Sequence, residues 1–305
     1  MKNQHELISF YNLENLFLPD FFGDKEQSGL KNWTKKRYEN KLHKIASVFE
    51  LIQKTEKKLP ILAGVCEIEN DRVLRDLVGQ KVFQGQYDFV HFDSMDERGI
   101  DVALLYDTNK IEVLYAEPFT YFFEIEDDNP DNYDTTRDVL YCRVRYENEV
   151  LNLFIVHLPS KRENDINAPK RGFILNKIKE KTTEMIQNQN EAVIILGDFN
   201  ENPNEPNIQS LMDGHLFFNP FLDLFKNRKY TTFYKRFGLT FDQIIYSINL
   251  RNHRFEFQEA QIFNHDEIRN YDKRFKGRPF RTYVGTRYLG GYSDHFPIYI
   301  RLKVI

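Results

Sequence analysis

Asp294 and His295 stand side by side before an alternating run in "YSDHFPIYIRL", residues 292–302. Apolar side chains at every second position of that run predict a strand with one face in a core. An adjacent aspartate and histidine can hold or transfer a proton beside a reacting group. The same pair can equally cap a strand, so the other polar positions of the chain must distinguish the two interpretations.

Six predicted strands carry hydrogen-bonding or acidic residues where they meet a loop. These residues are Asn12 with Asn15, Glu67 with Glu69, His157 with Ser160, Asp198 with Asn200, Asp242, and Asp294 with His295. Each one alone is most simply a turn residue, a strand cap or a satisfied core histidine. Because buried strands open to solvent at their ends, six such endings in one chain predict a functional site.

The residue types favour a hard cation. Asn, Asp and Glu offer oxygen ligands, and Mg²⁺ is typically held by one or two carboxylates together with water and substrate phosphate. The sequence has no HExxH motif, and Cys66 and Cys142 form neither a metal-binding cluster nor a disulfide framework, so zinc is disfavoured. It also lacks GxxxxGK[ST] and GxSxG, the usual signatures of P-loop NTPases and α/β-hydrolases.

Short apolar strands and longer amphipathic helices must position these residues. An apolar stripe predicts a helix from its N-cap, Thr34, to about Lys58, and residues 73–79 and 169–188 are also predicted to be helical. The predicted strands cover residues 7–13, 60–70, 87–92, 101–107, 111–125, 138–158 (a hairpin), 192–200, 241–247 and 295–302. Residues 258–292 are predicted to form a long loop. No Pro/Gly-rich break separates the two groups of strands, which predicts two packed sheets covered by helices in one domain, residues 1–305.

The overall charge excludes a grip on duplex nucleic acid by bulk attraction, because the net charge is −4 and the pI is about 6.1. Charge is nevertheless uneven along the chain. Residues 25–44 hold seven Lys or Arg and two acids, residues 265–288 hold seven and three, and residues 124–138 hold one Arg and seven acids. Most such runs are solvated faces. The N-terminal sequence lacks a signal-peptide pattern and no apolar run approaches a membrane span, so we expect a cytoplasmic monomer without a membrane anchor.

The order of these motifs resembles the endonuclease/exonuclease/phosphatase superfamily, which is deoxyribonuclease I-like. An Asn in the first strand is followed by "CE", "HLPS", "GDFN", "FDQI" and "SDH", and the match runs from about residue 7 to residue 302. "FYNLENLF", "CEIEN", "RGIDVALLYD" and "PFRTYVGTRYLGGYSDH" are most similar to bacterial members that are assigned as endonucleases without a known substrate. The resemblance implies an α/β fold, namely a four-layer α/β sandwich of two packed, mostly antiparallel sheets flanked by helices.

The resemblance also implies roles for individual residues. Metal binding is expected of Asn12, Glu67 and Asp294, with Mg²⁺ as cofactor and Mn²⁺ as a substitute. Catalytic roles are expected of His157, Asp198, Asp242 and His295. Phosphate or substrate binding is expected of Arg137, Asn200 and Arg281. The sequence departs from abasic-site endonucleases, which place a Tyr where His157 stands, and from inositol 5-phosphatases, which have "PAWCDRIL" around the aspartate that matches Asp242.

The expected activity is that of a divalent-metal-dependent phosphodiester hydrolase, an endonuclease acting on nucleic acid. Arg278, Arg281 and Arg287 are expected to contact substrate, with Phe280 and Tyr283 available to stack on a base. The acidic stretch is expected to lie away from the site. A phosphatase or phospholipid phosphodiesterase of the inositol phosphate or sphingomyelin type is the alternative, for which "PDFFGD", residues 19–24, is a faint candidate membrane contact. A catalytically inactive binding module is a third hypothesis.

Overall fold

Two six-stranded sheets pack face to face in the computed structural model, which describes residues 5–19, 30–124, 133–161 and 164–305. Most of the acidic stretch and most of "PDFFGD" therefore lie outside the described residues. The first sheet has the strand order β15 (Phe255–Ile262), β18 (Ile298–Val304), β1 (His5–Leu16), β2 (Leu62–Ile68), β4 (Asp101–Asp107) and β3 (Tyr87–His91). The second has the order β11 (Phe217–Phe218), β14 (Asp242–Ser247), β10 (Ala192–Asp198), β9 (Glu149–His157), β8 (Val139–Tyr146) and β5 (Ile111–Phe119).

Each sheet contains one parallel pair among otherwise antiparallel strands of the described chain. β1 runs parallel to β2, and β9 runs parallel to β10. Parallel neighbours need a crossover connection, and a long helix provides it in both cases: α1 (Lys35–Glu56) and α3 (Ala168–Gln189). The predicted fold class, two mostly antiparallel sheets flanked by helices, is confirmed.

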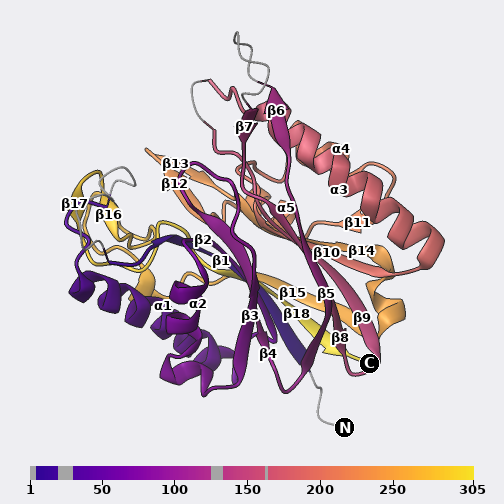
Figure 1. Cartoon of the computed structure of the whole chain (residues 1–305), viewed down its shortest axis with the longest axis horizontal. Helices are drawn as coiled ribbons and strands as arrows, with labels where there is room; N and C mark the ends of the chain where they lie inside the picture. Colours follow the sequence, from indigo (N-terminus) through magenta and orange to yellow (C-terminus); the bar gives the residue numbers. More distant parts are fainter. Residues whose placement is uncertain (1–4, 20–29, 125–132, 162–163) are drawn as a thin grey trace.

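Helices cover the outer faces of the two sheets (Figure 1). α1 and α2 (Asp71–Val78) lie against the first sheet, whereas α3 and α4 (Pro206–Met212) lie against the second. The side chain of Thr34 accepts a hydrogen bond from the backbone N–H of Arg37, which confirms Thr34 as the N-cap of α1. Among the described residues, the remaining helical segments are α5 (Phe221–Lys226) and the 3₁₀ turns η2 (Lys81–Phe83), η3 (Ile248–His253) and η4 (Asp266–Ile268).

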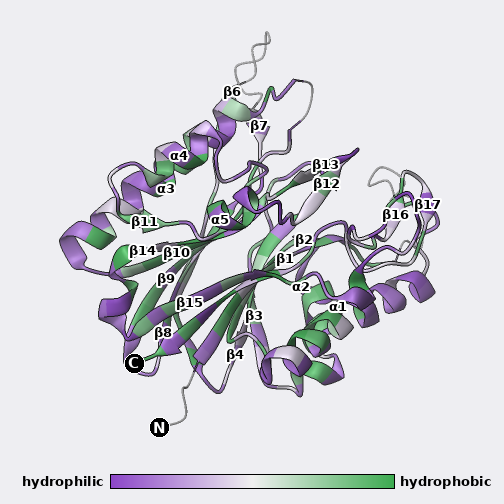
Figure 2. Cartoon of the chain, turned by 180° about the vertical axis from the view of Figure 1, so that it is seen from behind, coloured by the Kyte–Doolittle hydropathy of each residue, from purple (hydrophilic) through white to green (hydrophobic). Residues whose placement is uncertain are grey.

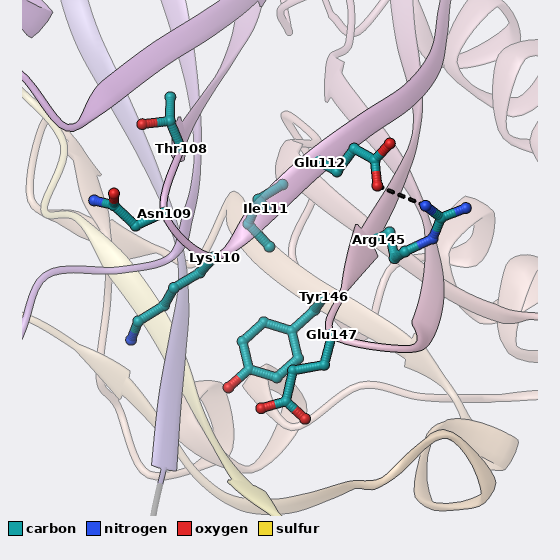
Figure 3. A pocket seen from close by; sticks show the side chains of 8 residues that line it. All are labelled: Thr108, Asn109, Lys110, Ile111, Glu112, Arg145, Tyr146 and Glu147. Atoms are coloured by element: carbon teal, nitrogen blue, oxygen red, sulfur yellow. Dashed lines mark hydrogen bonds and ion pairs between the residues drawn. The ribbon is translucent and has the colours of Figure 1, made fainter.

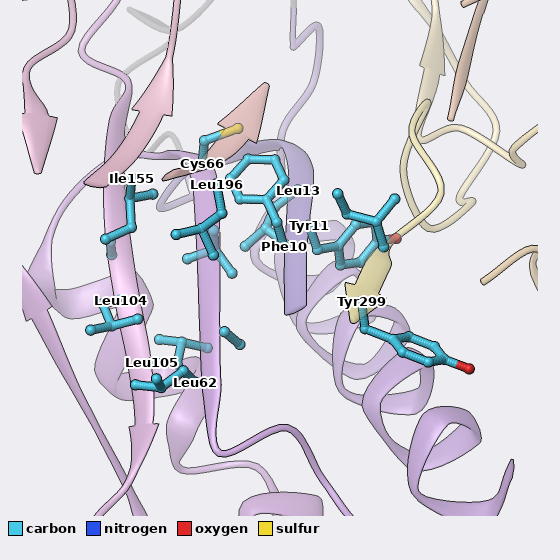
Figure 4. Packing of buried hydrophobic residues seen from close by; sticks show 14 of the residues in the cluster. Phe10, Tyr11, Leu13, Leu62, Cys66, Leu104, Leu105, Ile155, Leu196 and Tyr299 are labelled. Carbon is cyan, nitrogen blue, oxygen red and sulfur yellow. The ribbon is translucent and has the colours of Figure 1, made fainter. Parts of the chain in front are cut away.

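Apolar side chains fill the space between the sheets, as the hydropathy colouring and the close-up show (Figures 2 and 4). Gly64 on β2 allows the closest approach, because a Cβ there would lie 3.0 Å from Phe10 and 3.1 Å from Leu196 of the opposite sheet. Tyr299 of β18 is also buried, and its hydroxyl donates to Glu56 at the end of α1. The closing strand is therefore covered on both faces, not on one as its alternation predicted.

The prediction of a loop over residues 258–292 is wrong at its start. Residues up to Ile262 belong to β15, which pairs antiparallel with β18 through a register shift between Phe257 and Glu259. The strand is an edge strand with a half-exposed face, which weakens the apolar signal. Three small hairpins were also not predicted as pairs: β6 (Phe122–Glu124) with β7 (Tyr133–Thr135), β12 (Thr232–Tyr234) with β13 (Phe237–Leu239), and β16 (Tyr283–Val284) with β17 (Arg287–Tyr288).

Candidate active site

The polar strand ends meet at one edge of the two sheets, at the end of the molecule that carries the β12–β13 hairpin (Figure 1). Strand direction explains why. The carboxyl ends of the parallel pairs place Asn12 beside Cys66, and His157 beside Asp198. β14 and β18 run the other way, so their amino ends reach the same edge. There Asp242 pairs in register with Asp198, and His295 lies three residues before β18.

Glu67 owes its position to an irregular backbone. The β2–β4 register shifts between Cys66 and Ile68, and Glu67 itself has a φ of 59°, in the left-handed region. Such bulges redirect a side chain at the end of a strand, and a non-glycine residue in this conformation is held by its surroundings. Here one carboxylate oxygen accepts the backbone N–H of Asn15 at 3.0 Å. The other oxygen faces Asn12 and His157.

Asn12 bridges the two sheets. Its side-chain nitrogen donates to Glu67 at 3.3 Å and to Asp198 at 3.1 Å, while its side-chain oxygen accepts the backbone N–H of Glu14 at 3.0 Å. In this orientation Asn12 holds two carboxylates in place through its NH₂ group. Rotation of the amide by half a turn would present the oxygen toward them, as a metal ligand requires.

Asp242, His295 and Asp198 form a chain of interacting groups inside the site. Asp242 has no exposed surface, and its carboxylate contacts Nδ1 of His295 at 2.7 Å. The opposite nitrogen of the ring, Nε2, lies 3.9 Å from Asp198. The second oxygen of Asp242 is buried without a hydrogen-bond partner in the described chain. His295 is thereby oriented by one aspartate and aimed toward another.

Burial and neighbouring charge move the proton affinities of this group in opposite directions. Burial, reinforced by the charge of Asp242, raises the pKa of the Asp198 carboxyl to about 7. Burial opposes protonation of His295, but the Asp242 carboxylate and its hydrogen bond outweigh it and raise the pKa of His295 well above its ordinary value. The site therefore combines a carboxyl group with a pKa of about 7 and a histidine whose raised pKa favours its protonated form, a pairing suited to acid–base chemistry.

His157 and Arg137 lie on the side of the site away from His295. Nε2 of His157 is 3.9 Å from both Glu67 and Asp198, and its buried Nδ1 has no hydrogen-bond partner among the described residues. Burial and the Arg137 charge lower the pKa of His157 well below its ordinary value. The Arg137 guanidinium is itself buried, 3.3 Å from Asp96. Asp96 and Arg137 line a pocket of about 370 Å³.

Asn200 lies on the side of the site that holds His295. Asn200 donates to the carbonyl of Leu158, and its backbone N–H donates to Asp198 at 2.9 Å. Asn200, Ser160 and His295 line a second pocket of about 630 Å³. Ser160 also lines the pocket of Arg137, so the two hollows adjoin at this residue.

Asp294 and Arg281 contact each other. The Arg281 guanidinium donates to Asp294 at 2.9 Å, and it also approaches Glu14 at 3.4 Å. The described contacts do not join Asp294 to Glu67 or Asn12. The geometry thus groups Asp294 with Arg281, and the metal role of Asp294 and the substrate-binding role of Arg281 stay predictions.

Sequence reasoning missed two buried charges of opposite sign beneath this arginine, Glu14 and Lys41. The Glu14 carboxylate accepts the backbone N–H of Thr282 at 2.6 Å, and the Lys41 ammonium of α1 donates to the Thr282 hydroxyl at 2.6 Å and to the Tyr292 carbonyl at 2.5 Å. Burial raises the pKa of Glu14 to about 7 and lowers the pKa of Lys41 to about 8. Together the pair holds the segment that leads into Asp294 and His295.

Two expectations about the surroundings of the site are wrong. Tyr283 is 5% exposed and packs between Trp33 and Tyr288, so its ring covers the core and is not free to stack on a base. The described end of the acidic stretch does not lie away from the site, because Asp134 lines the same pocket as Arg137. Asp134 is paired there with Lys170, which offsets its charge.

The donor set fits a hard divalent cation. Glu67 and Asp198 converge on Asn12 and present oxygen atoms toward one point, and Glu67 keeps some solvent access with a side chain 15% exposed. Asp198, Asp242 and His295 also lie within 4.8 Å of one another, but the Asp242–His295 hydrogen bond already uses one of the two ring nitrogens. The Glu67 side is therefore the better cation position.

A second polar cluster, centred on His91, lies in the first sheet beside this edge, because Asp101 pairs with Ile68, the residue after Glu67. Nδ1 of His91 contacts Asp71 at 2.8 Å and its Nε2 contacts Asp101 at 3.1 Å, which links β3 to α2 and β4.

A shallow pocket at the opposite end of the sheets is lined by turn residues, among them Lys110, and by the Glu112–Arg145 pair (Figure 3). Within the described residues, none of the helices combines the length and apolarity needed to cross a bilayer.

The chain matches one family model and is similar to several solved structures. A family model described as "Endonuclease/Exonuclease/phosphatase family" matches residues 7–304. No curated protein sequence matches the chain. An endonuclease/exonuclease/phosphatase family protein from Bacteroides thetaiotaomicron has a similar structure, with 15% identity, a TM-score of 0.62, and coverage of 99% of this chain and 98% of that one.

Two further solved structures are similar at the same level. One is a mannosyl-6-phosphatase of Bacteroides thetaiotaomicron, with 16% identity, a TM-score of 0.62, and 97% and 99% of the two chains covered. The other is D. rerio TDP2 complexed with a single-strand DNA product, with 16% identity, a TM-score of 0.61, and 98% and 99% covered. At these identities the likeness shows the shared fold.

Proposed function

Because this chain belongs to the endonuclease/exonuclease/phosphatase family, we propose that it is a divalent-metal-dependent phosphodiester hydrolase that cleaves nucleic acid as an endonuclease. The observation that carries the proposal is the convergence of Asn12, Glu67, Asp198, Asp242 and His295 at one edge of both sheets. A phosphodiester is anionic, so its hydrolysis requires groups that offset charge and groups that move protons. This edge offers both kinds.

Glu67 is the proposed central ligand of the cation, with Asn12 beside it and Asp294 as the third candidate. Mg²⁺, or Mn²⁺ in its place, would supply positive charge to the phosphate oxygens and to the leaving oxygen when bound. The hydrogen bond from Asn15 to Glu67 orients the carboxylate for this purpose. Asn12 takes part after rotation of its amide, or otherwise acts as the link that spaces Glu67 and Asp198.

Asp198 is proposed to orient the attacking water and accept its proton. A carboxyl group with a pKa of about 7 is matched to proton transfer at neutral pH. The backbone N–H of Asn200 holds one oxygen of Asp198, which leaves the other directed into the site. The Asn200 side chain is proposed to contact phosphate once its bond to Leu158 is released.

His295 is proposed to donate to a nonbridging phosphate oxygen, in the orientation that Asp242 imposes. The 2.7 Å contact at Nδ1 directs Nε2 toward the space beside Asp198. His157 is proposed to act at the leaving oxygen from the other side. Arg137 and Arg281 supply positive charge at the two flanks of the reacting phosphate.

Nucleic acid is favoured as the substrate class by the cations around the two hollows. Lys161 and Arg278 contact aromatic residues of the larger hollow, and Arg98 and Lys170 line the smaller one. The similar TDP2 structure holds a single-strand DNA product, which is consistent with this choice. The protein is proposed to be a cytoplasmic monomer, which light scattering and cell fractionation would check.

Cleavage assays with Mg²⁺ test the proposal on supercoiled plasmid, single-stranded DNA, RNA, an abasic duplex, inositol phosphates, a sugar phosphate and sphingomyelin vesicles. Cleavage of a nucleic acid is expected, with loss in EDTA. Glu67→Ala and His295→Ala should each lower kcat by at least about two orders of magnitude, the scale of a lost acid or electrostatic group.

Glu112→Ala is the matched control, because Glu112 is an exposed carboxylate at the far end of the sheets and should leave kcat unchanged. Turnover of only a phosphorylated sugar, inositol or lipid would keep the site and overturn the substrate. Near-normal turnover by a folded Glu67→Ala or His295→Ala variant would overturn the assignment of residues. Inactivity on every substrate would leave the binding module as the explanation.

A further inference from the structure

An aromatic hollow opens directly beside His295. It has a volume of about 630 Å³, within the range of sites for nucleotides and other small ligands. Its apolar wall consists of Phe233, Tyr234, Phe237, Leu239 and Phe241, all from the β12–β13 hairpin and the segment that follows it. The opposite wall contains Ser160, Lys161, Asn164, Asp165 and Asn200.

The hairpin is fastened to the segment that carries His295. Thr232 forms an isolated antiparallel bridge with His295, and its hydroxyl donates to the carbonyl of Asp294 at 2.8 Å. The backbone N–H of Phe296 donates to the Thr231 carbonyl, also at 2.8 Å. The second strand, β13, packs closely on the Tyr230 ring, because a Cβ at Gly238 would lie 2.0 Å from that ring. The aromatic wall therefore has a defined position relative to the phosphate that His295 would contact.

Two rings at the tip of the hairpin are unusually exposed. Tyr234 is 63% exposed and Phe237 is 56% exposed, and the two residues are direct partners across the hairpin, so their side chains share a face. Rings of this size normally lose water contact on folding, and two exposed rings at a hollow indicate a surface that a ligand covers.

Cations accompany these rings. Lys235 and Arg236 form the turn between them, with the Lys235 ammonium 5.2 Å from the Tyr234 ring and the Arg236 guanidinium 5.3 Å from the Phe237 ring. Arg278 lies 5.2 Å from the Phe233 ring and donates to the Lys235 carbonyl. Rings interleaved with positive charge suit a flat base that is flanked by phosphates, and they suit an uncharged acyl chain poorly.

We infer that the β12–β13 hairpin binds one unstacked nucleobase next to the scissile phosphate, with Tyr234 and Phe237 as the stacking residues. The inference rests on the proposed function and narrows its substrate to single-stranded or locally opened nucleic acid. Bases in a duplex are covered on both faces by their neighbours, so a base can occupy the hollow only after it leaves the stack. Lys235, Arg236 and Arg278 would contact the adjoining phosphates.

Binding of single-stranded DNA and RNA oligonucleotides, measured by fluorescence anisotropy in EDTA, tests the inference without turnover. Tyr234→Ala with Phe237→Ala should weaken binding by about five- to a hundredfold, the range for loss of base–aromatic stacking. Tyr234→Phe with Phe237→Tyr should restore it. Tyr115→Ala removes a ring that is 51% exposed on edge strand β5 and should change nothing.

Oligonucleotides with one abasic spacer, scanned along the strand, separate stacking from charge. With the native hairpin one spacer position should weaken binding, and with the alanine pair the same spacer should have no further effect. An equal loss with and without the base would overturn the inference, as would unchanged binding in the folded alanine pair. If the native chain cleaves nucleic acid in Mg²⁺ while the hairpin variants bind normally, only the inference fails. If it cleaves none, the proposed function itself has failed.

Discussion

At the scale of single residues, the chemistry of this site depends on what holds each side chain. His295 has its direction and raised pKa because Asp242 is buried beside it at 2.7 Å. Asp198 has its raised pKa because it is buried and lies next to the same aspartate. The buried Asp242 charge thus favours the protonated forms of both His295 and Asp198. These effects require burial, since exposed charges at the same spacing are screened by water.

His91 gives a pH test at this scale. Burial disfavours the charged form of His91, but hydrogen bonds and charge from Asp101 and Asp71 outweigh burial and raise the pKa of His91 above 6.5. A third carboxylate, that of Asp93, lies 3.9 Å from Nε2 of the same ring. A raised folded-state pKa stabilises the fold fully below the unfolded value, and the contribution is lost as pH rises through the folded value.

We therefore expect His91→Gln to lower the free energy of unfolding by about 1–3 kcal/mol near pH 6 and by less near pH 9. Urea unfolding at both pH values measures this change in the free energy of unfolding. His43→Gln serves as the control, because His43 is exposed and its replacement should change the free energy of unfolding little at either pH. A loss for His91→Gln that grows with pH would contradict the prediction.

At the scale of elements, the buried Glu14–Lys41 pair joins three parts of the chain. Glu14 is on β1, Lys41 is on α1, and both bind the segment from Thr282 to Tyr292. Arg281, Asp294 and His295 flank or follow this segment. The pair therefore acts on the site by fixing the path of the backbone that presents those side chains.

Lys41→Met should cost about 1–3 kcal/mol in the free energy of unfolding, because it removes the buried donor to the Thr282 hydroxyl and the Tyr292 carbonyl and leaves Arg281 as the cation beside Glu14. Denaturant titration measures the loss. Lys36→Met, at an exposed position of the same helix, should cost close to nothing. Addition of Glu14→Gln to Lys41→Met should recover part of the loss, since it removes a buried negative charge that has lost one of its two neighbouring cations. Simple additivity of the two changes would argue against a coupled pair.

At the scale of the whole molecule, local charge and net charge have opposite signs. The chain carries a net charge of −4, yet Arg98, Arg137, Lys161, Arg278 and Arg281 gather around the site. A polyanion would be attracted at this end and repelled elsewhere, which orients it on approach. The ion pairs Lys170–Asp134 and Lys161–Glu205 offset part of this positive charge, which reduces the attraction for a polyanion without removing it.

The Michaelis constant for a single-stranded substrate should therefore rise with salt, with a logarithmic slope of about 0.7 per phosphate contacted. Steady-state kinetics across a range of NaCl concentrations measures the slope. Arg278→Ala should lower the slope, whereas Arg251→Ala, near the start of β15 and away from the site edge, should leave it unchanged. A Michaelis constant that does not vary with salt would exclude phosphate contacts of this kind.

The sequence by itself determined the strongly periodic elements and the polar strand ends. The N-cap and stripe of α1, the β8–β9 hairpin and the apolar strands β2, β10 and β14 are predictable because their signals are local. β15 was missed because it is an edge strand whose half-exposed face carries a weak pattern. The motif order was sufficient to name Asn12, Glu67, Asp198, Asp242 and His295, and strand direction explains why such ends meet.

Only the tertiary structure decided which charged and aromatic residues are buried. Lys41 and Glu14 look like surface residues in the sequence, and their burial depends on partners as far as 268 positions away. Tyr283 and Tyr234 both stand in basic, aromatic stretches, yet one is 5% exposed in the core and the other is 63% exposed at the hollow. Local patterns report the backbone, whereas the burial that sets proton affinity and ligand access arises when distant segments pack together.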